Sequence, residues 1–258
     1  MNILTKILAV VLCSTFGVQM ANAEQVVRIG TVLDQAPFEY RDSAGKVAGI
    51  EVALGNAMCE IMKVKCQWVT MDFDALIPAL KAKKIDAAFA QMTITKERQK
   101  TLDFSNPVTS AQVQYVAKTG SGITEDPKTL KGKTVGVQSG SIQEAYMRAR
   151  LSEVNTKVYQ TVNEAYLDLQ ANRIDAVLDD KSAEYDWIQK QGKQAGYDYA
   201  GKPITDAEIF GPGTGIAVRK GDTQLLSMIN GALSKIMADG TFAKETGKVF
   251  PFSIAPTQ

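Results

Sequence analysis

Arg98 is well suited to holding a carboxylate. It lies in the segment TITKER, directly after an apolar run, and a guanidinium donates two parallel hydrogen bonds to a carboxylate. Thr93 adds a hydroxyl in the same segment, and backbone N–H groups near the start of the following helix would serve the same anion. The alternative is a solvated arginine paired with Glu97 or Asp103.

A second candidate site is the glycine-containing junction at residues 136–143, GVQSGSIQ, between a predicted strand and a predicted helix. Such a junction leaves N–H groups unpaired at the start of the helix, where an anion can bind. Ser141 adds a hydroxyl there, and Gln138 and Gln143 add amides. The alternative is an ordinary serine N-cap. The Gly-Lys-Ser/Thr ending of a Walker phosphate loop is absent.

Asp180 is a candidate partner for an ammonium group. It stands beside Asp179 after the apolar run 174–178, and the alternative is a solvated turn. Phe73 or Phe38 would offer a ring to an apolar or cationic group. A guanidinium, an anion-binding junction and a carboxylate that face one cleft would fit a zwitterion, which indicates an amino acid.

The composition argues against several kinds of chemistry. The chain has no histidine, which removes histidine-based triads, histidine bases and histidine metal ligands. Only three cysteines are present, so zinc sites and cysteine nucleophiles lack their usual residues. With 29 Lys and Arg against 28 Asp and Glu, the charge indicates neither nucleic acid nor an acidic membrane as a partner. We expect no metal, no cofactor and no catalysis.

Residues 1–23 have the pattern of a secretory signal peptide. Lys6 precedes an apolar run at 7–18, and the ANA sequence that ends at Ala23 is a cleavage signal. The run is shorter than the roughly 20 apolar residues that span a bilayer. Cys13 follows a leucine rather than a small residue, which disfavours a lipid anchor. We therefore predict cleavage after Ala23 and a periplasmic location.

Removal of the leader would leave Cys59 and Cys66 in a compartment that permits disulfides. On one continuous helix they would lie about 10 Å apart, which is too far for a disulfide. We predict a bridge and a helix that ends before Cys66. The alternative is two separate buried thiols.

The order of predicted elements is typical of an α/β protein. Strand-like apolar runs alternate with helical patterns, and this order occurs twice. The first half has strands at 26–31, 67–69 and 85–90 and helices from 51 and 74, and the second has strands at 134–137, 158–160 and 174–178 and helices from 141 and 163.

A short internal repeat relates the two halves. LKAKKIDAAF at 80–89 recurs as LQANRIDAVL at 169–178, so that Gln91 and Asp180 follow the two strands at equivalent places. Ligands of open α/β sheets bind beyond the carboxyl ends of the strands. Both residues are therefore predicted to face a cleft.

We predict two lobes, each a sheet flanked by helices, with the ligand cleft between them. A predicted strand at 214–218 and a helix at 223–235 would return to the first lobe, and a chain that crosses twice forms a hinge. Lobe 1 comprises residues 24–110 plus 212–258, lobe 2 comprises 113–205, and the hinge crossovers are 110–113 and 205–212.

Several longer motifs carry a family resemblance: IGT at 29–31, APF at 36–38, LGNAMC at 54–59, VKC at 64–66, DFDALIPALKAKKID at 72–86, SGSIQEAY at 139–146 and GPGTG at 211–215. Along essentially its whole mature length, the chain resembles periplasmic binding proteins for lysine, arginine, ornithine and histidine, of solute-binding protein family 3. The resemblance implies the two-lobed periplasmic binding protein fold of type II.

The resemblance also implies roles for the matching residues. Arg98 would clamp the ligand carboxylate with help from Thr93 and Ser141, and Asp180 would take the α-ammonium. Phe73 would pack on the ligand side chain. The remaining candidates share an amide side chain at the cleft: Gln35, Gln91, Gln138 and Gln143.

The sequence departs from the family where side-chain specificity is set. Val32 stands where an acid is expected, and Gln35 stands where an aromatic residue is expected. An unpaired buried charge costs several kcal/mol, so Val32 should select against lysine more than against a neutral side chain. Asp34 or Glu39 could compensate.

We therefore predict a periplasmic substrate-binding component of an amino acid ABC transporter. It would capture a free amino acid or amino acid derivative by hinge closure and dock as a monomer on a membrane permease. The ligand stays open among arginine, ornithine, lysine, histidine, an opine and polar neutral amino acids. The alternatives are an exported cyclohexadienyl-dehydratase-like enzyme on the same fold and the sensory ligand-binding domain of a receptor.

Overall fold

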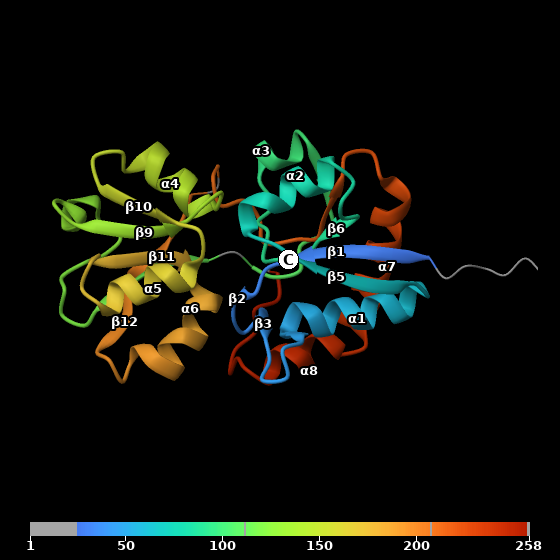
Figure 1. The fold of residues 1–258 in the computed structure, drawn as a ribbon. Helices are drawn as coiled ribbons and strands as arrows, with labels where there is room; N and C mark the ends of the chain where they lie inside the picture. The colour runs from blue at the N-terminus through green and yellow to red at the C-terminus, as the bar shows by residue number, and fades with distance from the viewer. Residues whose placement is uncertain (1–24, 111, 207, 257–258) are drawn as a thin grey trace, which may run out of the picture.

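A computed structural model describes residues 25–110, 112–206 and 208–256 of the chain. The expected leader, with Cys13, lies outside the described residues, as do residues 111 and 207 of the two expected crossovers. Figure 1 shows two bodies side by side, each built on its own sheet. In the ranges that the structure describes, no helix has the length and hydropathy needed to cross a bilayer.

The first sheet has the strand order β5-β1-β6-β13-β7. β1 runs parallel to β5 and β6, whereas β13 is antiparallel to β6 and β7. The strands are β1 (Val26–Thr31), β5 (Lys65–Thr70), β6 (Ala87–Ala88), β7 (Leu102–Phe104) and β13 (Ala217–Arg219).

Helices cover both faces of this sheet, because apolar side chains alternate between the two faces of each strand. Ile29 packs with Leu54 and Ile229 on one face, and Leu80 packs with Ile85 on the other. We call the first sheet and its flanking elements the first unit. These elements are α1 (Ile50–Met62), the 3-10 turn η1 (Phe73–Ala75), α2 (Leu76–Lys81), α3 (Lys96–Gln99), α7 (Thr223–Ala238) and α8 (Thr241–Gly247).

The second sheet, with its flanking elements, forms the second unit. Its strand order is β10-β9-β11-β8-β12. On β11, Leu178 packs in the core under α4, and Val177 packs on the opposite face under α5. The elements are β8 (Val113–Lys118), η2 (Pro127–Leu130), β9 (Thr134–Gln138), α4 (Ile142–Arg150), β10 (Asn155–Tyr159), α5 (Val162–Gln170), β11 (Ala176–Asp180), α6 (Lys181–Trp187), the π-turn η3 (Ile188–Gly192) and β12 (Tyr197–Ile204).

A small third sheet lies beside the first unit. It consists of β2 (Asp34–Gln35), β3 (Glu39–Arg41) and β4 (Val47–Ala48), and it pairs Gln35 with Glu39. In Figure 1, β2 and β3 lie on the side of the first unit that faces the second.

The predicted α/β architecture, with two sheets flanked by helices, is confirmed. The repeated residues Leu80, Ile85, Leu169 and Ile174 are all buried, as a core role requires. The predicted strand 85–90 is longer than β6. Residues 87–90 are apolar and buried, but only Ala87 and Ala88 pair with β13.

The predicted disulfide between Cys59 and Cys66 is also confirmed. α1 ends at Met62, and Lys63 takes a left-handed conformation with a φ of 56°. The chain therefore reverses into β5, which brings the two Cα atoms to 6.1 Å.

Two segments that connect the units meet at a pair of threonines. Thr109 and Thr214 form an antiparallel bridge, and their buried hydroxyl oxygens lie 2.6 Å apart. α6 adds a further contact between the units, because the Tyr185 ring centre lies 5.7 Å from that of Phe250. The connecting segments and α6 thus both contribute contacts that link the units.

Candidate ligand-binding site

Arg98 is buried at the interface between the two units. The Thr95 hydroxyl accepts the Arg98 backbone N–H at 3.1 Å and so caps α3. Arg98 Nη1 donates to the Thr93 carbonyl at 2.9 Å, and Nη2 donates to the Gly140 carbonyl of the second unit at 3.1 Å. The guanidinium carbon lies 5.5 Å from the centre of the Phe73 ring. The structure therefore brings Arg98, Thr93 and Phe73 together.

Asp180 is a buried acid of the second unit, at the end of β11. Its carboxylate accepts from Gln143 Nε2 at 3.2 Å. Burial raises the pKa of Asp180 to about 7, although the positive charge of Arg98 and the bond from Gln143 oppose the shift. Burial lowers the pKa of Arg98 to about 10, opposed by the charge of Asp180. One unit thus contributes a charged guanidinium and the other a carboxyl that titrates near neutral pH.

The junction before α4 is held by a reciprocal cap. Ser141 Oγ accepts the Glu144 N–H at 3.1 Å, while the Glu144 carboxylate accepts the Gly140 N–H at 2.7 Å. This is the N-cap that was the alternative interpretation of the junction. Because the cap uses a lone pair of Ser141, the hydroxyl proton can still be donated to an acceptor in the cleft.

The amide residues have different roles. Gln35 Nε2 donates to Gln138 Oε1 at 3.1 Å across the interface, and both residues are buried. Gln138 Nε2 donates to Asp34 Oδ2 at 3.1 Å, also across the interface. Gln91 is held within the first unit instead, because the Glu51 carboxylate accepts both its backbone N–H and its side-chain amide. Gln91 therefore anchors the turn that follows β6.

Two acids accept hydrogen bonds from the second unit, one in the small third sheet and one in the first unit. Asp34, whose direction the sequence left open, accepts the Val162 N–H at 3.2 Å as well as the Gln138 amide. Asp74, which sequence reasoning missed, accepts from Ser139 Oγ at 3.0 Å and from Gln160 Nε2 at 3.1 Å. The available signal was their position shortly after β1 and β5, at the carboxyl ends of parallel strands.

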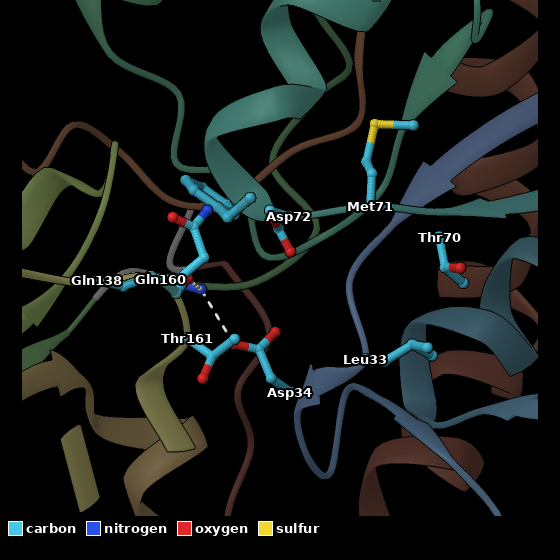
Figure 2. Close-up of a pocket in the computed structure, with 9 residues that line it drawn as sticks. Leu33, Asp34, Thr70, Met71, Asp72, Gln138, Gln160 and Thr161 are labelled. Atoms are coloured by element: carbon cyan, nitrogen blue, oxygen red, sulfur yellow. Dashed lines mark hydrogen bonds between the residues drawn. The ribbon is translucent and has the colours of Figure 1, made fainter. Parts of the chain in front are cut away.

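A cavity of about 320 Å³ opens between the two units beside Phe73. Figure 2 shows Asp34 and Gln138 approaching each other at its edge, with their hydrogen bond dashed. The lining residues lie at or just beyond the carboxyl ends of β1, β5, β9 and β10: Leu33, Asp34, Thr70, Met71, Asp72, Phe73, Gln138, Gln160 and Thr161.

Several buried acids lie within electrostatic reach of Asp34 or Asp180. Glu39, Glu51, Asp179 and Glu184 are buried, and burial raises the pKa of each carboxyl. Among the described residues, Arg98 is the one buried cation. A bound cation would favour the ionised form of these acids, so the site is electrostatically suited to a ligand with positive groups. Within residues 25–110, 112–206 and 208–256, no group of three or more Cys, Asp or Glu side chains is arranged to hold a metal ion.

Residues 27–251 match the sequence model of a family described as bacterial extracellular solute-binding proteins, family 3. The L-arginine-binding protein of Pseudomonas aeruginosa is 41% identical over 234 residues, which cover 90% of each chain. The lysine/arginine/ornithine-binding periplasmic protein of Escherichia coli K12 is 42% identical over 243 residues, covering 93% of this chain and 94% of the relative.

Solved structures show the same fold along the chain. A periplasmic binding protein of Salmonella typhimurium, described for its high arginine specificity, matches with a TM-score of 0.81 and 31% identity over 88% of this chain and 99% of that structure. An ancestral arginine-binding protein bound to arginine matches with a TM-score of 0.80 and 37% identity over 88% and 99% of the two chains. The fold is therefore the type II periplasmic binding protein fold.

Proposed function

Because the chain belongs to the bacterial extracellular solute-binding proteins, family 3, we propose that it is the amino-acid-binding component of an ABC importer. Its relatives are named for binding arginine, lysine, ornithine or histidine, so the proposed ligand is a basic α-amino acid, with arginine first. One observation carries the proposal: Arg98 and Asp180 come from different units and are buried at one interface.

The proposed clamp holds the α-carboxylate on Arg98 and the α-ammonium on Asp180. A guanidinium has five N–H donors, and the hydrogen bonds to Thr93 and Gly140 use two of them. The others remain for a carboxylate, which Ser141 would reach through its hydroxyl proton. Gln143 holds the Asp180 carboxylate.

Aromatic and amide side chains would shape the rest of the site. The Phe73 ring lies beside the Arg98 guanidinium and would offer apolar surface to the aliphatic part of the ligand. Gln35 and Gln138 close the interface, and Gln91 supports the turn beside Thr93.

The proposed mechanism is hinge closure between two lobes. The hydrogen bonds to Asp34, Asp74 and the Gly140 carbonyl join the units in the closed arrangement, and a ligand that contacts both units favours that arrangement over an open one. Strand membership supports the proposed boundaries: lobe 1 at 24–110 plus 212–258, lobe 2 at 113–205, and crossovers at 110–113 and 205–212.

Relatives from Escherichia coli are named as periplasmic proteins, which supports export of this chain with cleavage after Ala23. The proposed partner of the ligand-bound protein is a membrane permease, which it meets as a monomer. These relatives are binding proteins rather than enzymes, so the dehydratase-like alternative gains no support.

The protein is first unfolded and refolded to remove any bound ligand. Isothermal titration calorimetry and thermal unfolding of this ligand-free protein then test the proposal. Arginine, lysine or ornithine should bind and raise the melting temperature, because a ligand of the folded state stabilises it. Agmatine, which is arginine without the carboxylate, should bind far more weakly because Arg98 loses its partner. If no α-amino acid bound, the proposed function would be refuted.

A further inference from the structure

Val32 occupies the position where the family resemblance leads one to expect an acid, and it is 1% exposed in the apolar core of the first unit. Its neighbours in that core include Phe73 and Leu76. Any acid that recognises the far end of a basic ligand must therefore come from another position.

The cavity beside Phe73 has the chemistry of a cation subsite. Two carboxylates, Asp34 and Asp72, line it, and no lysine or arginine is among its lining residues. Leu33, Met71 and Phe73 add apolar surface for an aliphatic chain. At about 320 Å³ the cavity has room for a side chain that ends in a guanidinium or ammonium.

The cavity adjoins the proposed amino acid clamp at Phe73. Phe73 lines the cavity, and the Arg98 guanidinium carbon lies 5.5 Å from the centre of its ring. Gln138, which lines the cavity from the second unit, lies in the same junction as Ser141. A ligand with its carboxylate on Arg98 can therefore extend its side chain across Phe73 toward Asp34.

The Asp34 carboxylate is held in place through only one of its two oxygen atoms. Both of its hydrogen bonds, from Gln138 Nε2 and from the Val162 N–H, go to Oδ2. Oδ1 accepts no hydrogen bond from the described residues and is left for a ligand. Burial raises the pKa of Asp34, and the negative charge of Asp72 adds to that effect, although the Val162 bond opposes it.

Two buried acids with unpartnered oxygen atoms provide a second observation. Glu39, from β3, is fully buried, and neither of its carboxylate oxygens has a hydrogen-bond partner among the described residues. Asp179, from β11, is buried with Oδ2 unpartnered within the same described part. The charge of Asp34 reaches both groups. The interior therefore lacks positive charge around Asp34, where a distal cation would supply it.

We infer that Asp34 is a specificity-determining residue, which binds the distal cationic group of the ligand within this cavity while Asp72 contributes charge at its edge. The inference rests on the proposed function. It places the acid that selects a basic side chain two residues beyond Val32, on β2 rather than at the end of β1.

A matched pair of variants, Asp34→Asn and Asp74→Asn, tests the inference. Each removes one negative charge and alters an acid that accepts two hydrogen bonds from the second unit, but only Asp34 lines the cavity. The ligands are arginine and citrulline, which carries a neutral ureido group in place of the guanidinium. Dissociation constants are measured by calorimetry, and melting temperatures check that both variants fold.

Asp34→Asn should weaken arginine binding about 10- to 100-fold, the range for loss of a charge-assisted hydrogen bond, and should change citrulline binding much less. Asp74→Asn should change both affinities by the same factor. Equal losses of arginine and citrulline binding in Asp34→Asn, or unchanged arginine binding, would overturn the inference and leave the proposed function standing. A wild-type protein that bound no α-amino acid would refute the proposed function, and the inference with it.

Discussion

The backbone of Gly140 in the second unit lies directly against Asp74 in the first. A Cβ atom placed on Gly140 would lie 3.1 Å from the Asp74 Cβ and 3.3 Å from its Cα. The neighbouring carbonyl of Gly140 accepts the hydrogen bond from Arg98. A side chain at position 140 would therefore act where the two units are in contact beside the proposed carboxylate site.

Gly140→Ala should lower ligand affinity about tenfold or more, because overpacking at a closed contact costs about 1–3 kcal/mol. Calorimetry with arginine measures the loss. Gly132→Ala is the matched control, since Gly132 has a φ of 74° against 72° for Gly140, but the methyl group of an alanine there would meet no packed neighbour within 4 Å. Both variants should lose similar stability from the left-handed backbone. Equal affinity for arginine in the two variants would contradict this reasoning.

Arg98→Lys should weaken binding of every α-amino acid about 100-fold or more, because truncating one partner of a buried, hydrogen-bonded charge pair costs about 2–5 kcal/mol or more and a lysine lacks the planar fork of donors. The measurement is calorimetry with arginine and glutamine. Arg148→Lys is the control, since that side chain is 73% exposed on α4. A variant at position 98 that retained wild-type affinity would remove the proposed carboxylate site.

Asp180 should make the ligand-free protein less stable as the pH rises from about 4 to about 7. Its pKa in the folded protein is about 7, against an ordinary value of 3.8, so the folded state keeps a proton that the unfolded chain has released. The free energy of unfolding then falls by at most about 1.4 kcal/mol per pH unit for this one group.

Urea unfolding of the ligand-stripped wild-type protein and of Asp180→Asn at several pH values isolates the contribution of Asp180 to the free energy of unfolding. Relative to wild type, the variant should gain stability progressively between pH 4 and pH 7, since it lacks the group that must ionise. A difference that stayed constant over this range would show that Asp180 does not titrate there. Arginine should reduce the effect in wild type, because its ammonium stabilises the ionised carboxylate.

The double variant Cys59→Ser, Cys66→Ser should unfold more easily while binding arginine normally. Closing so short a loop stabilises a folded chain by about 2–3 kcal/mol in the chain-entropy account. The bridge joins the end of α1 to the start of β5, away from Glu51, which supports the cleft at the other end of that helix. Denaturant unfolding measures the loss, and a large change in affinity would show that the bridge reaches the site.

Local sequence patterns predicted the parts of the fold that depend on neighbouring residues. Alternation of apolar runs identified both sheets, and a bridge between Cys59 and Cys66 required α1 to end before Cys66, as it does. The proximity of Arg98 and Thr93, five residues apart, could also be predicted from position. So could that of Gln143, in the helix after β9, and Asp180, at the end of the neighbouring strand β11.

Contacts that depend on how the two units meet could not be predicted from the sequence. Asp74 gains its role only when Ser139 and Gln160 arrive from the other unit, and no local pattern encodes that approach. Gln91 was not predictable for a different reason, since its amide is occupied by Glu51 of the same unit, 40 residues earlier. Its side chain therefore supports the turn, a role that its type and position alone do not distinguish from direct contact with a ligand.

The pair of threonines that joins the two connections, Thr109 and Thr214, has a consequence for how tightly a small molecule can be held. Each unit offers only part of the proposed contacts, and separately each would bind a free amino acid weakly. Tethering makes the second encounter intramolecular, so its cost is set by the effective concentration of one half near the other. We therefore expect that changes confined to the connections would alter affinity without altering any side chain of the proposed clamp.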